Sequence, residues 1–177
     1  VVAGLRDAGE DRERLQEFAA GVSEPDHPVV VCGGEVEVEQ AVVGEGTWRA
    51  GDRITTSPLR EVDDQQLIMK CTRTDRLFQM RTPLKSRIMG SAAYHLCKVA
   101  DGTALAGVET TPKVWDLAAA YLIVYEAGGV LVAADGEPIF PLAAERRDYK
   151  TRSVTTLCAA NSDILQHLKS AMVVRGR

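Results

Sequence analysis

The chain has 177 residues, of which 45% are hydrophobic and 26% charged, and its 25 acidic and 21 basic residues give a formal net charge of −4. This length suits one domain, or one large lobe of a larger protein, with enough chain for a sizeable core. The acidic balance argues against a nucleic-acid-binding surface. The longest apolar run, Leu117 to Tyr125, is far shorter than the roughly 20 residues that span a bilayer. Because the four cysteines are scattered without metal-ligand spacing, we expect reduced thiols and a cytoplasmic protein.

The first part of the chain divides at a proline-rich turn. Residues 1–28 are strongly charged and contain a short amphipathic helical pattern, which ends before Pro25 and Pro28. Two β-branched runs then flank Gly33-Gly34, which predicts a hairpin over residues 29–43. The alternation Glu35-Val36-Glu37-Val38-Glu39 has a period of two and places three carboxylates on one face of a strand. We expect this to be the solvent face.

Strand and helix patterns alternate in the rest of the chain. A strand is predicted over residues 67–71, and it is followed by a locally basic segment. Helices are predicted over 92–100, where Ser91 is a suitable N-cap, over 115–125 and over 162–172, where Asn161 or Ser162 is the cap. Further strands are predicted over 104–108, 130–132 and 154–160. This alternation predicts a layered α/β domain.

Three features of this half could take part in chemistry. Gly90-Ser91-Ala92 begins a helix, where free backbone N–H groups attract anions such as phosphate. Glu109 ends an apolar strand, and Asp116 lies in the first turn of a nearly all-apolar helix. Each feature alone has an ordinary structural explanation: a helix start, a strand end and a helix cap. A carboxylate in the position of Asp116 could also bind a hard cation such as Mg²⁺.

The order of these features resembles the inositol monophosphatase family of Mg²⁺-dependent phosphatases. The resemblance covers roughly residues 29–172, and its most specific part runs from Trp-Asp to Glu-Ala-Gly-Gly. The matching segments are Gly44-Glu45-Gly46-Thr47-Trp48, Gly90-Ser91-Ala92-Ala93, Val99-Ala100-Asp101-Gly102, Glu109, Trp115-Asp116-Leu117-Ala118-Ala119, Glu126-Ala127-Gly128-Gly129-Val130 and Ala159-Ala160-Asn161.

The resemblance implies the C-terminal lobe of a layered α/β/α sugar-phosphatase fold, with an N-terminal hairpin region. We therefore divide the chain into a charged leader or variant segment, 1–28, and an inositol-monophosphatase-like α/β domain, 29–177. The implied activity is Mg²⁺-dependent hydrolysis of a small phosphorylated metabolite (an inositol phosphate, a sugar phosphate or a nucleotide phosphate) by a homodimer. By resemblance, Asp116 would be a catalytic residue, a Mg²⁺ ligand and a substrate contact. Gly90, Ser91, Ala92 and Glu109 would also bind the substrate.

The sequence departs from the family at its N-terminal end. The family carries a Glu-Glu metal motif and an Asp-Pro-hydrophobic-Asp-Gly-Thr motif, and neither occurs in residues 1–28. One carboxylate, Asp116, cannot hold a catalytic Mg²⁺ tightly, because such sites use several oxygen ligands. Three interpretations follow. The chain belongs to an active phosphatase whose remaining motifs lie outside it, it is a catalytically degenerate relative that binds ligand, or it is a dimerisation lobe.

Other residues near these motifs have simpler explanations. His95 lies within a predicted helix, and we expect a packed or surface histidine rather than a general acid. Lys113 and Arg87 flank the predicted site, where they could pair with phosphate or serve only as surface charges. The apolar segment 139–142 is predicted to be an edge or a subunit contact.

Overall fold

A computed structural model of the protein describes residues 29–33, 37–142, 148–149 and 151–176. At its centre lies a five-stranded sheet with the order β7-β5-β8-β10-β9. The first three of these strands run parallel, and β10 pairs antiparallel with both β8 and β9. The strands are β5 (Leu67–Lys70), β7 (Lys85–Arg87), β8 (Ala106–Glu109), β9 (Val130–Ala133) and β10 (Thr156–Ala159).

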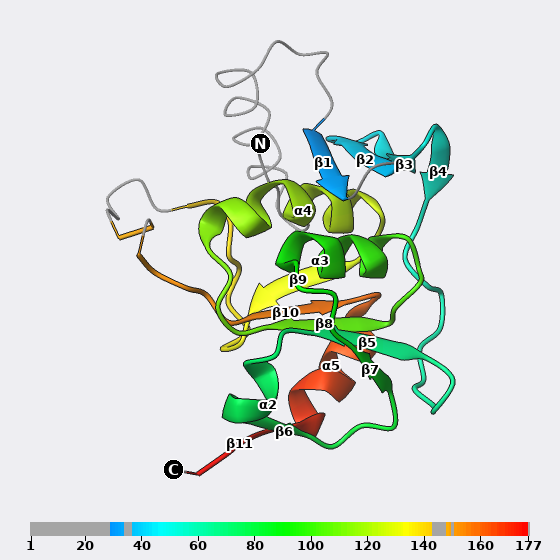
Figure 1. The fold of residues 1–177 in the computed structure, drawn as a ribbon. Helices are drawn as coiled ribbons and strands as arrows, with labels where there is room; N and C mark the ends of the chain where they lie inside the picture. The colour runs from blue at the N-terminus through cyan, green and yellow to red at the C-terminus, as the bar shows by residue number, and fades with distance from the viewer. Residues whose placement is uncertain (1–28, 34–36, 143–147, 150, 177) are drawn as a thin grey trace.

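Helices cover both faces of the central sheet (Figure 1). Helices α3 (Ala92–Ala100) and α4 (Val114–Glu126) lie on one face, and α5 (Ser162–Ala171) lies on the other. One core cluster includes Leu96, Leu117 and Ile123 from the first pair of helices, and a second includes Leu157 and Ile164. These layers confirm the predicted α/β/α fold, and the three helices match their predicted ranges to within one residue at each end.

A second sheet covers the outer side of α4. It is antiparallel with the order β1-β2-β3-β4, and the predicted hairpin is confirmed as its first two strands. Its strands are β1 (Val29–Gly33), β2 (Glu37–Val42), β3 (Gly46–Arg49) and β4 (Asp52–Ile54). Helix α4 therefore lies between two sheets, with β1, β2 and β3 on one side and β9 on the other (Figure 1). A helix in this position buries most of its surface, which accounts for its nearly all-apolar sequence.

The Glu-Ala-Gly-Gly block ends α4 and connects it to its neighbours. Glu126 Oε1 accepts a hydrogen bond of 2.9 Å from the Gly44 backbone N–H, which ties the helix to the turn between β2 and β3. Gly128 has a φ of +94°, a left-handed conformation that favours glycine after a helix. A Cβ at Gly129 would lie 2.7 Å from Val124 Cγ1 and 3.1 Å from the carbonyl oxygen of Ala159. The residues of this block are thus required by packing and backbone conformation.

The prediction that the carboxylate row faces solvent is wrong at Glu39. This side chain is buried, and burial raises its pKa, although the charge of Lys98 partly offsets the effect. By the strand period, Glu39 shares its face with Ala41, which is also buried. Ala41 belongs to the core cluster, so this face is directed toward the core, where the charges of Lys98 and Arg49 also act on Glu39. The side chains of Glu35 and Glu37 lie outside the described residues.

Three short elements had no counterpart in the sequence prediction. They are α2 (Thr74–Leu77), β6 (Phe78–Met80) and β11 (Met172–Val174), and the two strands pair antiparallel.

In the segment 139–142, Phe140 is a core residue whose ring lies 4.9 Å from that of Tyr121. Pro141 and Leu142 are exposed, so the segment is only partly in the core, and a role in subunit contact stays a prediction. The segment 1–28 lies outside the described residues. None of the described helices is long and apolar enough to cross a membrane.

Candidate functional site

The five residues predicted to form the site line a single pocket. Gly90, Ser91, Ala92, Glu109 and Asp116 surround a cavity of about 360 Å³. The first three come from the start of α3, Glu109 from the end of β8, and Asp116 from the first turn of α4. Two helix starts and a strand end therefore meet at one place. The roles assigned to these five residues stay predictions.

The start of α3 presents its backbone to this pocket. Gly90 has a φ of +82°, and nothing lies within 4 Å of the position where a Cβ would be. The predicted N-cap is confirmed, because Ser91 Oγ accepts a hydrogen bond of 3.3 Å from the Tyr94 N–H. The amides of Ala92 and Ala93 belong to the first turn, where no intrahelical carbonyl is available to them. Such a helix start can receive an anion.

Asp116 takes part in the helix cap and also lines the pocket. Its Oδ2 accepts a hydrogen bond of 2.8 Å from the backbone N–H of Lys113, just before the helix. The structure shows no hydrogen bond to its other oxygen from the described part of the chain. The two explanations offered by the sequence, a cap and a ligand, are therefore compatible in one side chain.

His95 and Glu109 form a buried pair in the lining of the pocket. Their side chains are 1% and 4% exposed, and His95 Nδ1 contacts Glu109 Oε1. His95 is thus packed, as expected, but it also belongs to the candidate site, which the sequence prediction did not include. The available signal was helical spacing, since His95 lies three and four residues after Ala92 and Ser91 and shares their face.

Cys71 is a further pocket residue that the sequence prediction missed. Burial tends to raise the pKa of its thiol, but hydrogen bonds with Thr110 and Thr74 outweigh that effect and lower the pKa overall. The Cys71 Sγ lies 3.0 Å from Thr110 Oγ1 and 3.4 Å from Thr74 Oγ1. No sequence motif distinguished Cys71 from the other three cysteines.

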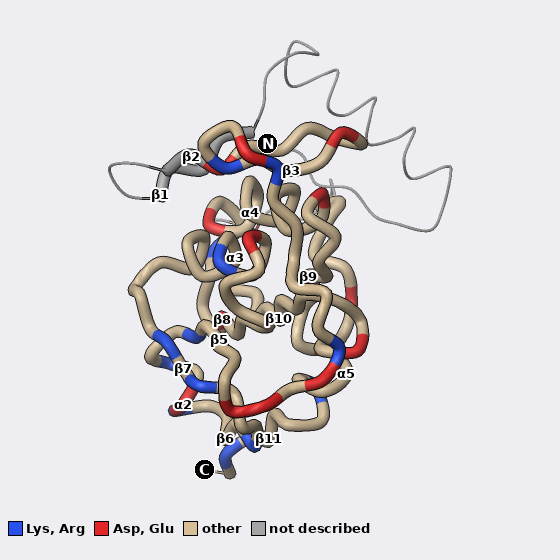
Figure 2. Tube along the Cα trace, turned by 90° about the vertical axis from the view of Figure 1, so that its right-hand side faces the viewer, with Lys and Arg blue, Asp and Glu red and all other residues tan. Residues whose placement is uncertain are grey.

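The basic residues proposed as phosphate partners lie outside the pocket lining. Arg87 Nη1 donates to the Ser86 carbonyl on the exposed strand β7, and Lys113 Nζ donates to the Thr151 carbonyl. Basic residues do gather around α2 and β7, in the lower part of the molecule (Figure 2). A direct contact between these groups and phosphate stays a prediction.

The described residues do not supply a complete metal site. No three of their His, Cys, Asp or Glu side chains are grouped so that they could hold a metal ion. An Asp-Gly-Thr triplet does occur at residues 101–103, but it follows α3. The buried carboxylate of Asp101 accepts hydrogen bonds from Arg49 at 2.5 Å and Lys98 at 2.7 Å. Asp116 alone falls short of the several oxygen ligands that Mg²⁺ requires.

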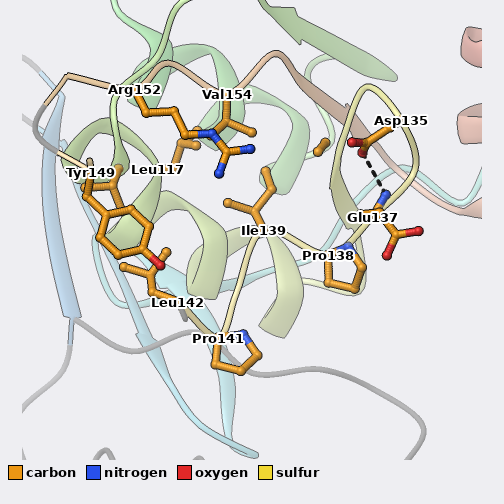
Figure 3. Close-up of a pocket in the computed structure, with 12 residues that line it drawn as sticks. Leu117, Asp135, Glu137, Pro138, Ile139, Pro141, Leu142, Tyr149, Arg152 and Val154 are labelled. Atoms are coloured by element: carbon orange, nitrogen blue, oxygen red, sulfur yellow. Dashed lines mark hydrogen bonds between the residues drawn. The ribbon is translucent and has the colours of Figure 1, made fainter. Parts of the chain in front are cut away.

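A second pocket, of about 200 Å³, includes Val114 and Leu117 from the start of α4 (Figure 3). Its walls include Leu117, Ile139 and Val154, with Arg152 and Tyr149 at one side and Asp135 at the other. None of the five predicted site residues lines it. The first pocket, which all five residues line, is therefore the better candidate.

Comparison with known proteins decides the family. The model of the inositol monophosphatase family matches residues 28–172. The chain belongs to the inositol monophosphatase family. It is 33% identical to inositol monophosphatase 1 of Sus scrofa, in a match that covers 58% of this chain and 41% of the pig protein. It is 37% identical to human inositol monophosphatase 2, over 41% of this chain and 25% of the human protein.

Solved structures of the family show the same fold. The SuhB protein of Bartonella henselae matches with a TM-score of 0.61 and 27% identity, over 76% of this chain and 53% of that one. An inositol monophosphatase from Anabaena matches with a TM-score of 0.58 and 22% identity, over 76% and 55% of the two chains. The chain thus spans about half the length of these structures, and less of the curated relatives that it matches. The family is generally metal-dependent, and its relatives are named as phosphatases.

Proposed function

We propose that this chain takes part in the hydrolysis of a small phosphate monoester, and that its own residues contribute the binding of the substrate. The observation that carries the proposal is the pocket in which the start of α3, Glu109 and Asp116 meet. The names of its relatives point to an inositol monophosphate as the first substrate to test. Sugar phosphates and nucleotide phosphates belong to the same chemical class.

The chemistry of the pocket suits such a ligand. A phosphoryl group would accept hydrogen bonds from the backbone amides at the start of α3, where the helix dipole also favours an anion. Glu109 presents a carboxylate that can accept a hydrogen bond from a hydroxyl of the alcohol part. Asp116 lies beside both groups and would contact the substrate as well. The pocket therefore offers separate partners for the two parts of a polyol phosphate.

Mg²⁺ is the cofactor that we propose for the hydrolysis. Asp116 would supply one of its oxygen ligands, and the others would have to come from outside the described residues. We also propose a homodimer in the cytoplasm, which binds neither nucleic acid nor membrane.

Two measurements on the full chain test this proposal. Calorimetry should detect saturable binding of inositol 1-phosphate, and phosphate release from the same compound should require Mg²⁺. Asp116→Asn should abolish Mg²⁺-dependent turnover, whereas Asp52→Asn, an exposed carboxylate on β4, should leave it unchanged. If the wild-type chain neither binds nor hydrolyses the compound, the proposal is wrong.

The alternative is a relative that binds the ligand without turning it over. The lack of a grouped set of metal ligands among the described residues favours it. In that case the same calorimetry would show binding that Mg²⁺ does not change, with no phosphate release at any Mg²⁺ concentration. A dimerisation lobe would show neither property but would sediment as a dimer.

A further inference from the structure

We propose that His95 is a positioning residue that links the two substrate-binding sides of the pocket. Its imidazole contacts Glu109 through Nδ1 and the turn before α3 through Nε2. The inference rests on the proposed function, because it assigns His95 the task of setting how well the pocket recognises the alcohol part of a phosphate ester.

The hydrogen bonds of His95 determine where its ring carries a proton. Nε2 accepts a hydrogen bond of 2.8 Å from the backbone N–H of Met89. A backbone amide can only donate, so Nε2 is without a proton in this arrangement. In the neutral imidazole the proton is then on Nδ1, which faces Glu109 Oε1. The Met89 amide thus fixes the tautomer that donates to Glu109.

This donation gives Glu109 a defined orientation. The carboxylate is almost completely buried, and a buried carboxylate without a donor is strongly disfavoured. With Oε1 occupied by the imidazole, the second oxygen is the group left to accept a hydrogen bond from a ligand. A substrate hydroxyl would then meet an acceptor that is already in place, which lowers the cost of binding.

The same imidazole supports the turn that contacts the phosphoryl group. Met89 is 57% exposed and Ile88 is 46% exposed, so neither residue fixes this turn by burial. Gly90, next in the chain, has the left-handed φ described above. The bond from Met89 N–H to the buried ring therefore holds the turn from inside. Through His95, the turn and Glu109 share one rigid support.

Two conservative variants separate the two hydrogen bonds. The side-chain amide of asparagine reaches about as far as Nδ1 of histidine, and that of glutamine about as far as Nε2. His95→Asn should therefore keep the donor to Glu109 and lose the acceptor for Met89. His95→Gln should do the reverse.

The test compares two probes, inositol 1-phosphate and inorganic phosphate, by calorimetry on the full chain. In His95→Gln the affinity for inositol 1-phosphate should fall about 10-fold, as expected for one hydrogen bond to a charged group, with little change for inorganic phosphate. In His95→Asn the two affinities should fall together, so that their ratio stays as in the wild type. A purely structural role would move both probes together in both variants.

A second measurement follows the ring itself. ¹⁵N spectra of the histidine side chains should show one ring that is protonated at Nδ1 and unprotonated at Nε2, and that is absent from both variants. His27 and His167 remain in each spectrum as internal references. A proton on Nε2 of His95, or an unchanged affinity ratio in His95→Gln while the wild type binds, would overturn the positioning role alone. A wild-type chain that binds neither probe would overturn the proposed function, and the positioning role with it.

Discussion

Replacing Gly129 by alanine should lower the free energy of unfolding, because the added methyl group would clash with its surroundings. The new methyl group would lie 2.7 Å from Val124 Cγ1, 3.0 Å from Thr56 Cγ2 and 3.1 Å from the carbonyl oxygen of Ala159. The first two contacts involve side chains that can shift slightly. The third involves the backbone of β10 next to the core, which cannot move without disturbing the central sheet.

The magnitude follows from what overpacking costs in well-packed cores. An added methyl group that forces neighbours to move typically costs about 1–3 kcal/mol. We expect the upper half of that range here, because three atoms from three different segments are too close. Urea unfolding of the full chain, followed by circular dichroism, would measure the loss in the free energy of unfolding.

The matched control is Gly176→Ala, since nothing lies within 4 Å of the corresponding Cβ position. The double variant Gly129→Ala, Val124→Ala should be less destabilised than the sum of its single variants, by about 0.5 kcal/mol or more, because the closest clash is removed. If Gly129→Ala unfolds within about 0.5 kcal/mol of the wild type, as surface substitutions usually do, the packing argument is wrong.

Two further predictions concern titratable groups. Because its pKa is lowered, Cys71 should react with a thiol reagent at lower pH than an ordinary cysteine, and this phase should vanish in Cys71→Ser. Burial raises the pKa of Cys97 and Cys158, which should stay unreactive while the chain is folded. Burial also raises the pKa of Glu39 above 4.5, so its contribution to stability is present at low pH and is lost as the pH rises through that raised pKa. As the pH rises from 4.5 to 7, the free energy of unfolding should therefore fall less in Glu39→Gln than in the wild type. Urea unfolding at each pH measures this fall, and an equal fall in both proteins would contradict the prediction.

Local signals in the sequence were sufficient for α3, α4 and α5 and for most strands, but not for the short helix α2. The caps at Ser91 and Asn161 are side-chain contacts within four residues, and the structure confirms both. The pairing of β6 with β11 joins segments about ninety residues apart, and no local pattern marks it. The burial of Glu39 also depends on tertiary contacts that no local pattern marks. Strand alternation identifies which residues share a face, but which face turns inward depends on what packs against the strand, here α4, which lies elsewhere in the sequence.

The candidate site was predictable where it coincides with motifs and was missed where it depends on contacts. Gly90, Ser91, Ala92, Glu109 and Asp116 were identified through a resemblance, and the fold brings all five to one pocket. The contact of His95 with Glu109 joins a helix to a strand end. Spacing placed His95 on the helix face of Ser91, but only the tertiary structure shows what that face meets.

Part of the family motif in this chain has a structural role rather than a chemical one. Glu126, Gly128 and Gly129 belong to the most specific part of the resemblance, and each has a structural reason that does not involve a ligand. They hold α4 between two sheets, and this fixes where the first turn of the helix, with Asp116, lies relative to α3 and β8. A chain can therefore keep the motif, the fold and the candidate pocket whatever becomes of its metal ligands. For this reason ligand binding and phosphate release have to be measured separately, and binding by the wild-type chain is the more direct test of what its own residues do.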